Sequence, residues 1–240
     1  MEQAKALVRI RKKLASQLDC SEEEFLKEGV QYVVNQKSRL PFFQIVALGE
    51  SIVVSVSKDV KNKVMPFVQK RTREELFECP FLYGQTIGYL PDFKADRKLA
   101  TLDGITFVRY ENEELAQLQG VEGFEDALDY DVEGKIISKI ALVAKDGERI
   151  IGIAAANEVF EGVWEVGIDV VKAYRRKKVA YTLVNNLSIE LLQREIVPLY
   201  RAASSNIASQ AVAHRSGFMP VYVESYRTYL DGSNCFNELT

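Results

Sequence analysis

Residues 170–180 read VVKAYRRKKVA, and they join a predicted strand to a predicted amphipathic helix. The helix is expected over Arg176–Glu195, where apolar residues recur every four positions from Val179 to Leu191. The start of a helix exposes unpaired backbone N–H groups and carries a partial positive charge. Four basic residues at that point, Arg175 to Lys178, favour a phosphate-bearing ligand, although a solvated basic turn would have the same composition.

On both sides of this turn, strands and helices follow one another in an irregular order. This order predicts a mixed α/β (α+β) fold around one sheet. Two apolar runs meet at Gly49-Glu50 and two more at Asp146-Gly147, so each pair predicts a hairpin. The expected strands are Phe42–Leu48, Ser51–Ser57, Ile105–Tyr110, Lys139–Ala144, Arg149–Ala156, Val163–Val170, Leu199–Ala202 and a tail over Met219–Tyr229. The expected further helices lie within Met1–Leu18, Ser21–Gly29, Lys58–Lys70, Glu113–Gln119 and Ile207–Ser216, with Pro66 ending or kinking the third.

Proline and glycine are concentrated between Cys79 and Gly104, and such residues interrupt regular structure. We therefore expect an N-terminal α/β domain over residues 1–103 and a second domain over residues 104–240. The N-terminal Met1–Leu18 has helical apolar spacing rather than a continuous apolar run, which is typical of a folded helix and not of a targeting segment.

The composition excludes several classes of function. The 240 residues have a net charge of −3, whereas binding to nucleic acid or to an anionic membrane surface is driven by a basic excess. His214 is the single histidine, so a multi-histidine metal centre is excluded and no metal is expected. Cys20, Cys79 and Cys235 are odd in number and far apart, which favours a reducing cytoplasm over a secreted disulfide framework.

The basic turn resembles the acyl-CoA-binding motif of the GNAT N-acetyltransferase superfamily, Arg/Gln-x-x-Gly-x-Gly/Ala. It stands here as Arg175–Ala180, with Lys178 in place of the first glycine. Upstream, WEVGIDV at residues 164–170 resembles the family's central strand. Downstream, Asn206 to Phe218 resembles its Asn-x-x-Ser/Ala…Gly-Phe motif. The resemblance implies a mixed, mostly antiparallel sheet flanked by helices in the second domain.

The resemblance also implies acetyl-CoA as co-substrate and direct attack of an amine on the thioester. Glu165 matches the family's catalytic glutamate, but it could equally be the outward residue of an alternating strand. The residues that the resemblance implies for cofactor binding are Ile168, Asp169, Val170, Arg175, Arg176, Lys177, Lys178, Val179, Ala180, Asn206 and Ser209.

Other assignments stay open at this point. Asn206 could serve as a helix N-cap as well as a cofactor contact. Ala213 stands where the family often has a tyrosine general acid, and nothing selects among Tyr181, Tyr200 and His214 as substitutes. The missing tyrosine favours a rival function, a non-catalytic acetyl-CoA-binding or sensing module. A structural protein with this fold and no ligand is a second rival.

The acceptor is expected to be a small-molecule or peptide amine. The acidic stretch Glu111–Glu133 would suit a cationic amine such as a polyamine, a lysine side chain or an aminoglycoside, or it is simply a solvated face. Residues 1–103 could form a degenerate GNAT-like lobe, a lid or acceptor-recognition domain, or a dimerisation element, so a homodimer is left open.

Overall fold

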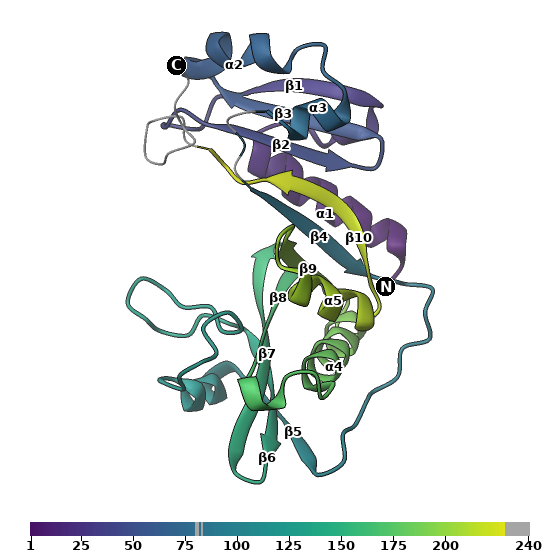
Figure 1. Ribbon diagram of the computed structural model, residues 1–240, viewed down its shortest axis with the longest axis vertical. Helices are drawn as coiled ribbons and strands as arrows, with labels where there is room; N and C mark the ends of the chain where they lie inside the picture. Colours follow the sequence, from purple (N-terminus) through teal and green to yellow (C-terminus); the bar gives the residue numbers. More distant parts are fainter. Residues whose placement is uncertain (80–81, 83, 229–240) are drawn as a thin grey trace. The chain divides into compact units, whose positions relative to one another are not determined.

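The computed structural model describes residues 1–79, 82 and 84–228, and the chain forms two compact units (Figure 1). The first unit consists of Met1–Arg9, Tyr89–Arg201 and Asn206–Met219, and the second consists of Ile10–Gly88, Ala202–Ser205 and the chain from Pro220 onward. The boundary expected between residues 103 and 104 stays a prediction. Cys235 and the end of the expected tail, Tyr229, lie outside the described residues. Within the described chain, no helix is both long and apolar enough to cross a membrane.

The first unit contains a sheet in which β5, β6, β7 and β8 pair in antiparallel fashion and β9 joins β8 in parallel. The strands are β5 (Ile105–Glu111), β6 (Ile140–Asp146), β7 (Arg149–Phe160), β8 (Val163–Val170) and β9 (Val197–Ala203). The hairpin expected at Asp146-Gly147 is confirmed, and Gly147 has the positive φ of 57° that such a turn requires. The strand expected at Val163–Val170 has the predicted bounds.

Helices cover both faces of this sheet. Helix α4 (Val179–Gln193) packs on one face, where a side chain at Gly152 would meet Val179 and Leu183 (Figure 1). The 3₁₀ segment η3 (Asn112–Leu118), where a short helix was expected, packs on the other face with the turn at residues 124–128. Buried apolar residues of β6 and β7 complete that second core. Sites at the end of β8 are therefore held by packing from two sides.

The second unit contains a sheet with the strand order β1-β3-β2-β10. The expected β2–β3 hairpin is confirmed, β1 pairs with β3 in parallel, and β10 pairs with β2 in antiparallel fashion. The strands are β1 (Gly29–Asn35), β2 (Phe43–Leu48), β3 (Ser51–Ser57) and β10 (Phe218–Ser225), which belongs to this unit from Pro220 onward. A further strand, β4 (Gln85–Pro91), belongs to this unit up to Gly88. Neither β1 nor β4 was predicted, because neither has the regular apolar alternation of a half-buried strand.

Helical segments pack on the apolar strands of this unit. They are α1 (Gln3–Leu18), η1 (Glu22–Leu26), η2 (Lys58–Val60), α2 (Lys61–Val68) and α3 (Arg73–Phe77). The expected N-terminal helix is confirmed, and its apolar residues Ile10, Leu14 and Leu18 are fully buried. Pro66 lies inside α2, which ends two residues later.

Gly88 is required by the packing of Tyr222, because a methyl group built on Gly88 would overlap the tyrosine ring. We expect Gly88→Ala to lower the free energy of unfolding by about 2 kcal/mol, as overpacked sites do. Urea denaturation monitored by circular dichroism measures this cost. In a Tyr222→Ala background the same glycine substitution should cost almost nothing, because the overlap is gone. An equal cost in both backgrounds would contradict the steric explanation.

Candidate active site

Strands β8 and β9 stop pairing after Glu165. The two strands are in parallel register only at Val163–Glu165, opposite Val197–Leu199. On its other side, β8 stays paired with β7 as far as Val170. The described pairing therefore leaves the β9-facing edge of residues 166–170 open, and backbone N–H and C=O groups there can bind an extended ligand arm. The predicted cofactor residues Ile168, Asp169 and Val170 lie along this edge.

The turn after β8 has an unusual backbone. It passes through η4 (Lys172–Tyr174), after which Arg176 and Lys178 have φ of 65° and 67°. This is the left-handed region that only glycine enters without strain. Lys178 thus has the conformation for which a glycine would be suited, and this conformation also explains why α4 begins at Val179 rather than at Arg176.

Lys178 is the N-cap residue of α4, and its side chain makes no capping hydrogen bond. The first backbone N–H groups of a helix have no partner within the helix. Those of Val179 and Ala180 are therefore available to an anion, and the helix dipole favours negative charge there. No capping side chain of Lys178 competes for these backbone donors.

Substituting Lys178 by glycine should stabilise the protein. A left-handed conformation costs a non-glycine residue about 1–2 kcal/mol, part of which is offset by the extra freedom of glycine in the unfolded chain. We expect Lys178→Gly to raise the free energy of unfolding by about 1 kcal/mol in urea denaturation. Lys177→Gly is the matched control, because the neighbouring lysine has no positive φ and should only lose stability. A loss of stability in both variants would contradict the strain assigned to Lys178.

The basic side chains around the turn have different contacts. Arg175 donates from Nε to the carbonyl oxygen of Val170 at 3.0 Å, which ties the turn to the end of β8. The Lys177 ammonium lies 4.9 Å from the centre of the Tyr174 ring. The Tyr174 hydroxyl donates to the Asp146 carboxylate at 2.6 Å, and this hydrogen bond raises the pKa of Tyr174. These contacts hold the turn against the ends of β6 and β8. The basic side chains of the turn stay exposed.

Glu165, the predicted base, lies at the last position of β8 that pairs with β9. Its Oε1 accepts a hydrogen bond from Nε of Arg201 at 2.9 Å, and the two side chains are 26% and 35% exposed. The carboxylate is therefore held in an ion pair where the pairing of β8 with β9 ends. Sequence reasoning missed Arg201, although a lone arginine in the apolar run of residues 197–202 was an available signal.

Helix α5 (Ile207–Arg215) begins at Asn206, whose side chain accepts a hydrogen bond from the Ser209 N–H at 3.0 Å. The expectation of an N-cap is thus confirmed, and the cofactor contact of Asn206 stays a prediction. The Ser209 hydroxyl lies 2.8 Å from the hydroxyl of Tyr200. Tyr200 is only 2% exposed, and burial raises its pKa. Of the predicted cofactor residues, Ser209 therefore already has a partner from β9.

The structure narrows the alternatives for a general acid without assigning one. Ala213 is fully buried in α5, so the position that carries a tyrosine in the family lies in the core here. His214 packs edge-on against Tyr89 with ring centres 5.5 Å apart. Tyr200 is the candidate whose hydroxyl contacts another predicted site residue, Ser209.

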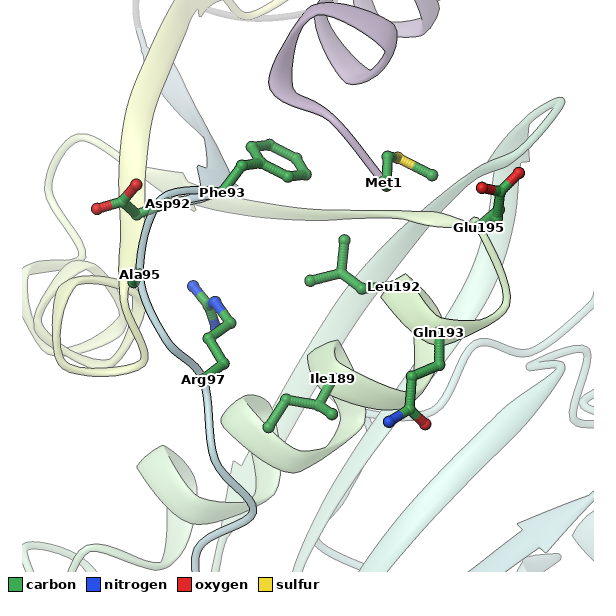
Figure 2. A pocket seen from close by; sticks show the side chains of 9 residues that line it. All are labelled: Met1, Asp92, Phe93, Ala95, Arg97, Ile189, Leu192, Gln193 and Glu195. Atoms are coloured by element: carbon green, nitrogen blue, oxygen red, sulfur yellow. The ribbon is translucent and has the colours of Figure 1, made fainter.

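A cavity of about 440 Å³ lies elsewhere on the first unit, beside the second half of α4 (Figure 2). Its lining residues are Met1, Asp92, Phe93, Ala95, Arg97, Ile189, Leu192, Gln193 and Glu195. Ile189 is ten residues from Val179, which is about 15 Å along a helix, so the cavity is separate from the basic turn. Arg97 donates to the carbonyl oxygens of Ser216 and Gly217, and Figure 2 shows the Asp92 and Glu195 carboxylates directed away from the cavity.

Comparison with known proteins shows the family and the fold of this chain. A family model described as GNAT acetyltransferase matches residues 21–229, so the chain belongs to the GNAT acetyltransferase family. A GCN5-related N-acetyltransferase-like protein from Streptococcus suis has a similar fold, with 13% identity, coverage of 93% of this chain and 99% of that one, and a TM-score of 0.52. No curated protein matches the sequence.

Two further structures match with lower TM-scores. A GNAT-family acetyltransferase from Novosphingobium aromaticivorans matches at 13% identity with a TM-score of 0.47, and the match covers 60% of this chain. This chain spans 63% of that protein. A GCN5-related N-acetyltransferase from Sphaerobacter thermophilus matches at 13% identity with a TM-score of 0.49, covering 76% of this chain and 57% of that one.

Proposed function

We propose that this protein is an acetyl-CoA-dependent N-acetyltransferase that acts in the cytoplasm on a small-molecule or peptide amine. The observation that carries the proposal is the left-handed turn at Lys178, set at the start of α4 and beside the open edge of β8. The amides of the turn would hold the pyrophosphate of acetyl-CoA, and the edge of β8 would hold the pantetheine arm. Arg175 to Lys178 supply the positive charge that such a ligand requires.

The reaction is the transfer of an acetyl group from sulfur to nitrogen. The amine nitrogen forms a bond to the carbonyl carbon of the thioester, the carbon–sulfur bond breaks, and the products are an amide and the CoA thiol. Glu165 would accept the proton that the amine loses, directly or through a water molecule. A backbone N–H on the open edge of β8 would stabilise the oxyanion. The departing thiolate takes up a proton.

A second function, binding of acetyl-CoA without catalysis, is favoured by one observation. The Glu165 carboxylate is already paired with Arg201, and the position of the family's tyrosine is the buried Ala213. A protein with these features could retain the cofactor site and lack an effective acid and base. The two functions therefore share a cofactor site and differ in turnover.

Two measurements on the same preparation separate these functions. Isothermal titration with acetyl-CoA measures binding, and release of the CoA thiol measures turnover with spermidine, Nα-acetyl-lysine amide and kanamycin as acceptors. Binding with turnover of at least one amine supports the acetyltransferase. Binding without turnover of any amine favours the binding module. Absence of binding would contradict both and leave a structural role for the fold.

A further inference from the structure

One turn of the first unit is fastened to β8 by a single carboxylate. Asp169 Oδ2 accepts hydrogen bonds from the backbone N–H groups of Asp126 at 2.8 Å and Ala127 at 3.0 Å. The N–H groups of Ala127 and Leu128 also donate to the carbonyl oxygen of Phe124, so residues 124–128 form a helical turn. Asp169 thus caps this turn from β8. It lies 42 residues after Ala127 in the chain.

The turn lies directly on the backbone of β8 at Gly167. A Cβ atom built on Gly167 would lie 2.5 Å from the carbonyl oxygen of Asp126 and 2.8 Å from that of Ala127. Since these are backbone atoms, no side chain fits at this position unless the turn moves. Phe124, Ala127 and Leu128 are at most 4% exposed, so the turn also packs into the core through these side chains.

The turn is placed on the same face of β8 as the candidate base. Side chains alternate along a strand, so Glu165, Gly167 and Asp169 share one face. We propose that Asp169 is a positioning residue that holds the 124–128 turn on β8 and thereby fixes a wall of the acceptor site next to Glu165. The assignment of the wall to an acceptor site rests on the proposed acetyltransferase function, whereas the fastening of the turn does not.

Burial and neighbouring groups shift the pKa of Asp169 in opposite directions. Burial raises its pKa, the nearby carboxylates Asp126 and Glu125 add to this effect, and the two amide hydrogen bonds oppose it. Because the folded-state pKa lies above the unfolded value, the contribution of this group to stability is present at low pH and is lost as the pH rises.

Hydrogen exchange measured by NMR tests the fastening of the turn directly. The amide of Asp126 is the sharper reporter, because the Ala127 N–H is shared with Phe124. We expect Asp169→Ala to speed exchange at Asp126 about tenfold or more, whereas Asp169→Asn keeps an acceptor oxygen and should retain most of the protection. The amide of Val143, a fully buried residue of β6, serves as an internal reference for global stability.

Two further variants sharpen this test. Asp131→Ala is the matched control, because the Asp131 carboxylate also accepts two backbone N–H groups, those of Glu133 and Lys135, but does not contact β8 through them. It should leave exchange at Asp126 unchanged. Gly167→Ala should speed that exchange with the carboxylate intact, since its methyl group displaces the turn. Unchanged exchange at Asp126 in Asp169→Ala would overturn the proposal.

Kinetics test the link to the acceptor. With the best amine of the three named above, Asp169→Ala should raise the KM for the amine about tenfold and change the Kd for acetyl-CoA less than about twofold, with rescue by Asp169→Asn. Equal loss in the Ala and Asn variants would overturn the positioning role, because it would mean that the charge itself acts on the substrate. If no amine is acetylated, the proposed function fails, and the exchange data alone decide whether Asp169 holds the turn.

Discussion

Arg175→Glu should raise the dissociation constant of acetyl-CoA about 100-fold, which corresponds to about 2.7 kcal/mol. The substitution puts a negative charge beside the site proposed for the pyrophosphate, where a charge reversal acts on two or more phosphate charges at close range. It also removes the hydrogen bond from Arg175 to the carbonyl oxygen of Val170, which ties the turn to β8. Isothermal titration with acetyl-CoA measures the change.

Two control variants test whether the charge at Arg175 determines the affinity for acetyl-CoA. Arg39→Glu carries the same change of charge on an exposed side chain of the second unit and should leave the affinity unchanged. Arg175→Gln removes the charge without reversing it and should weaken binding only about tenfold. A wild-type affinity in Arg175→Glu would show that the turn is not the phosphate site.

Glu165→Gln should lower kcat about 100-fold and leave the dissociation constant of acetyl-CoA unchanged. The amide cannot take a proton from the attacking amine, and loss of a general base typically costs two to four orders of magnitude in rate. The variant keeps an oxygen that can accept the hydrogen bond from Arg201, so the local packing is retained. Steady-state release of the CoA thiol with the best acceptor, next to titration with acetyl-CoA, measures both quantities.

Arg201→Gln is the matched control for this prediction. If Glu165 acts as a base, removal of its partner leaves the carboxylate in place, and kcat should fall less than about tenfold. If the ion pair matters only for holding β8 and β9 together, the two variants should lose activity equally. Equal losses would therefore contradict the catalytic role of Glu165.

Elements with a strong apolar period could be predicted from the sequence. Strand β8 has its predicted bounds, and both hairpins turn at the expected glycines, because alternation and turn residues are local signals. Strands β1 and β4 escaped prediction because neither has a regular apolar alternation, and the sequence does not show that β1 pairs with β3. The N-terminus of α4 was misplaced by three residues, since no residue in the sequence marks a left-handed conformation when glycine is absent.

The elements that carry the candidate site could be predicted in position, and their contacts less so. The basic turn and the strand before it could be located by spacing alone. The partner of Glu165 could not, because Arg201 comes from a strand that adjoins β8 only in the folded sheet. For the same reason the sequence did not separate Asp169, whose side chain binds a distant turn, from neighbours expected to contact the cofactor.

The pairing of β2 with β10 has a consequence for the biosynthesis of this protein. Strand β2 is buried throughout, and one of its edges is covered by Tyr222–Glu224 of β10. A ribosome adds about 5–20 residues per second, so the roughly 170 residues between the two strands take about 10–30 s to synthesise. During that interval the nascent chain presents an uncovered apolar edge, which is a template for aggregation. The yield of folded protein should therefore depend on chaperones that bind the chain before translation is complete.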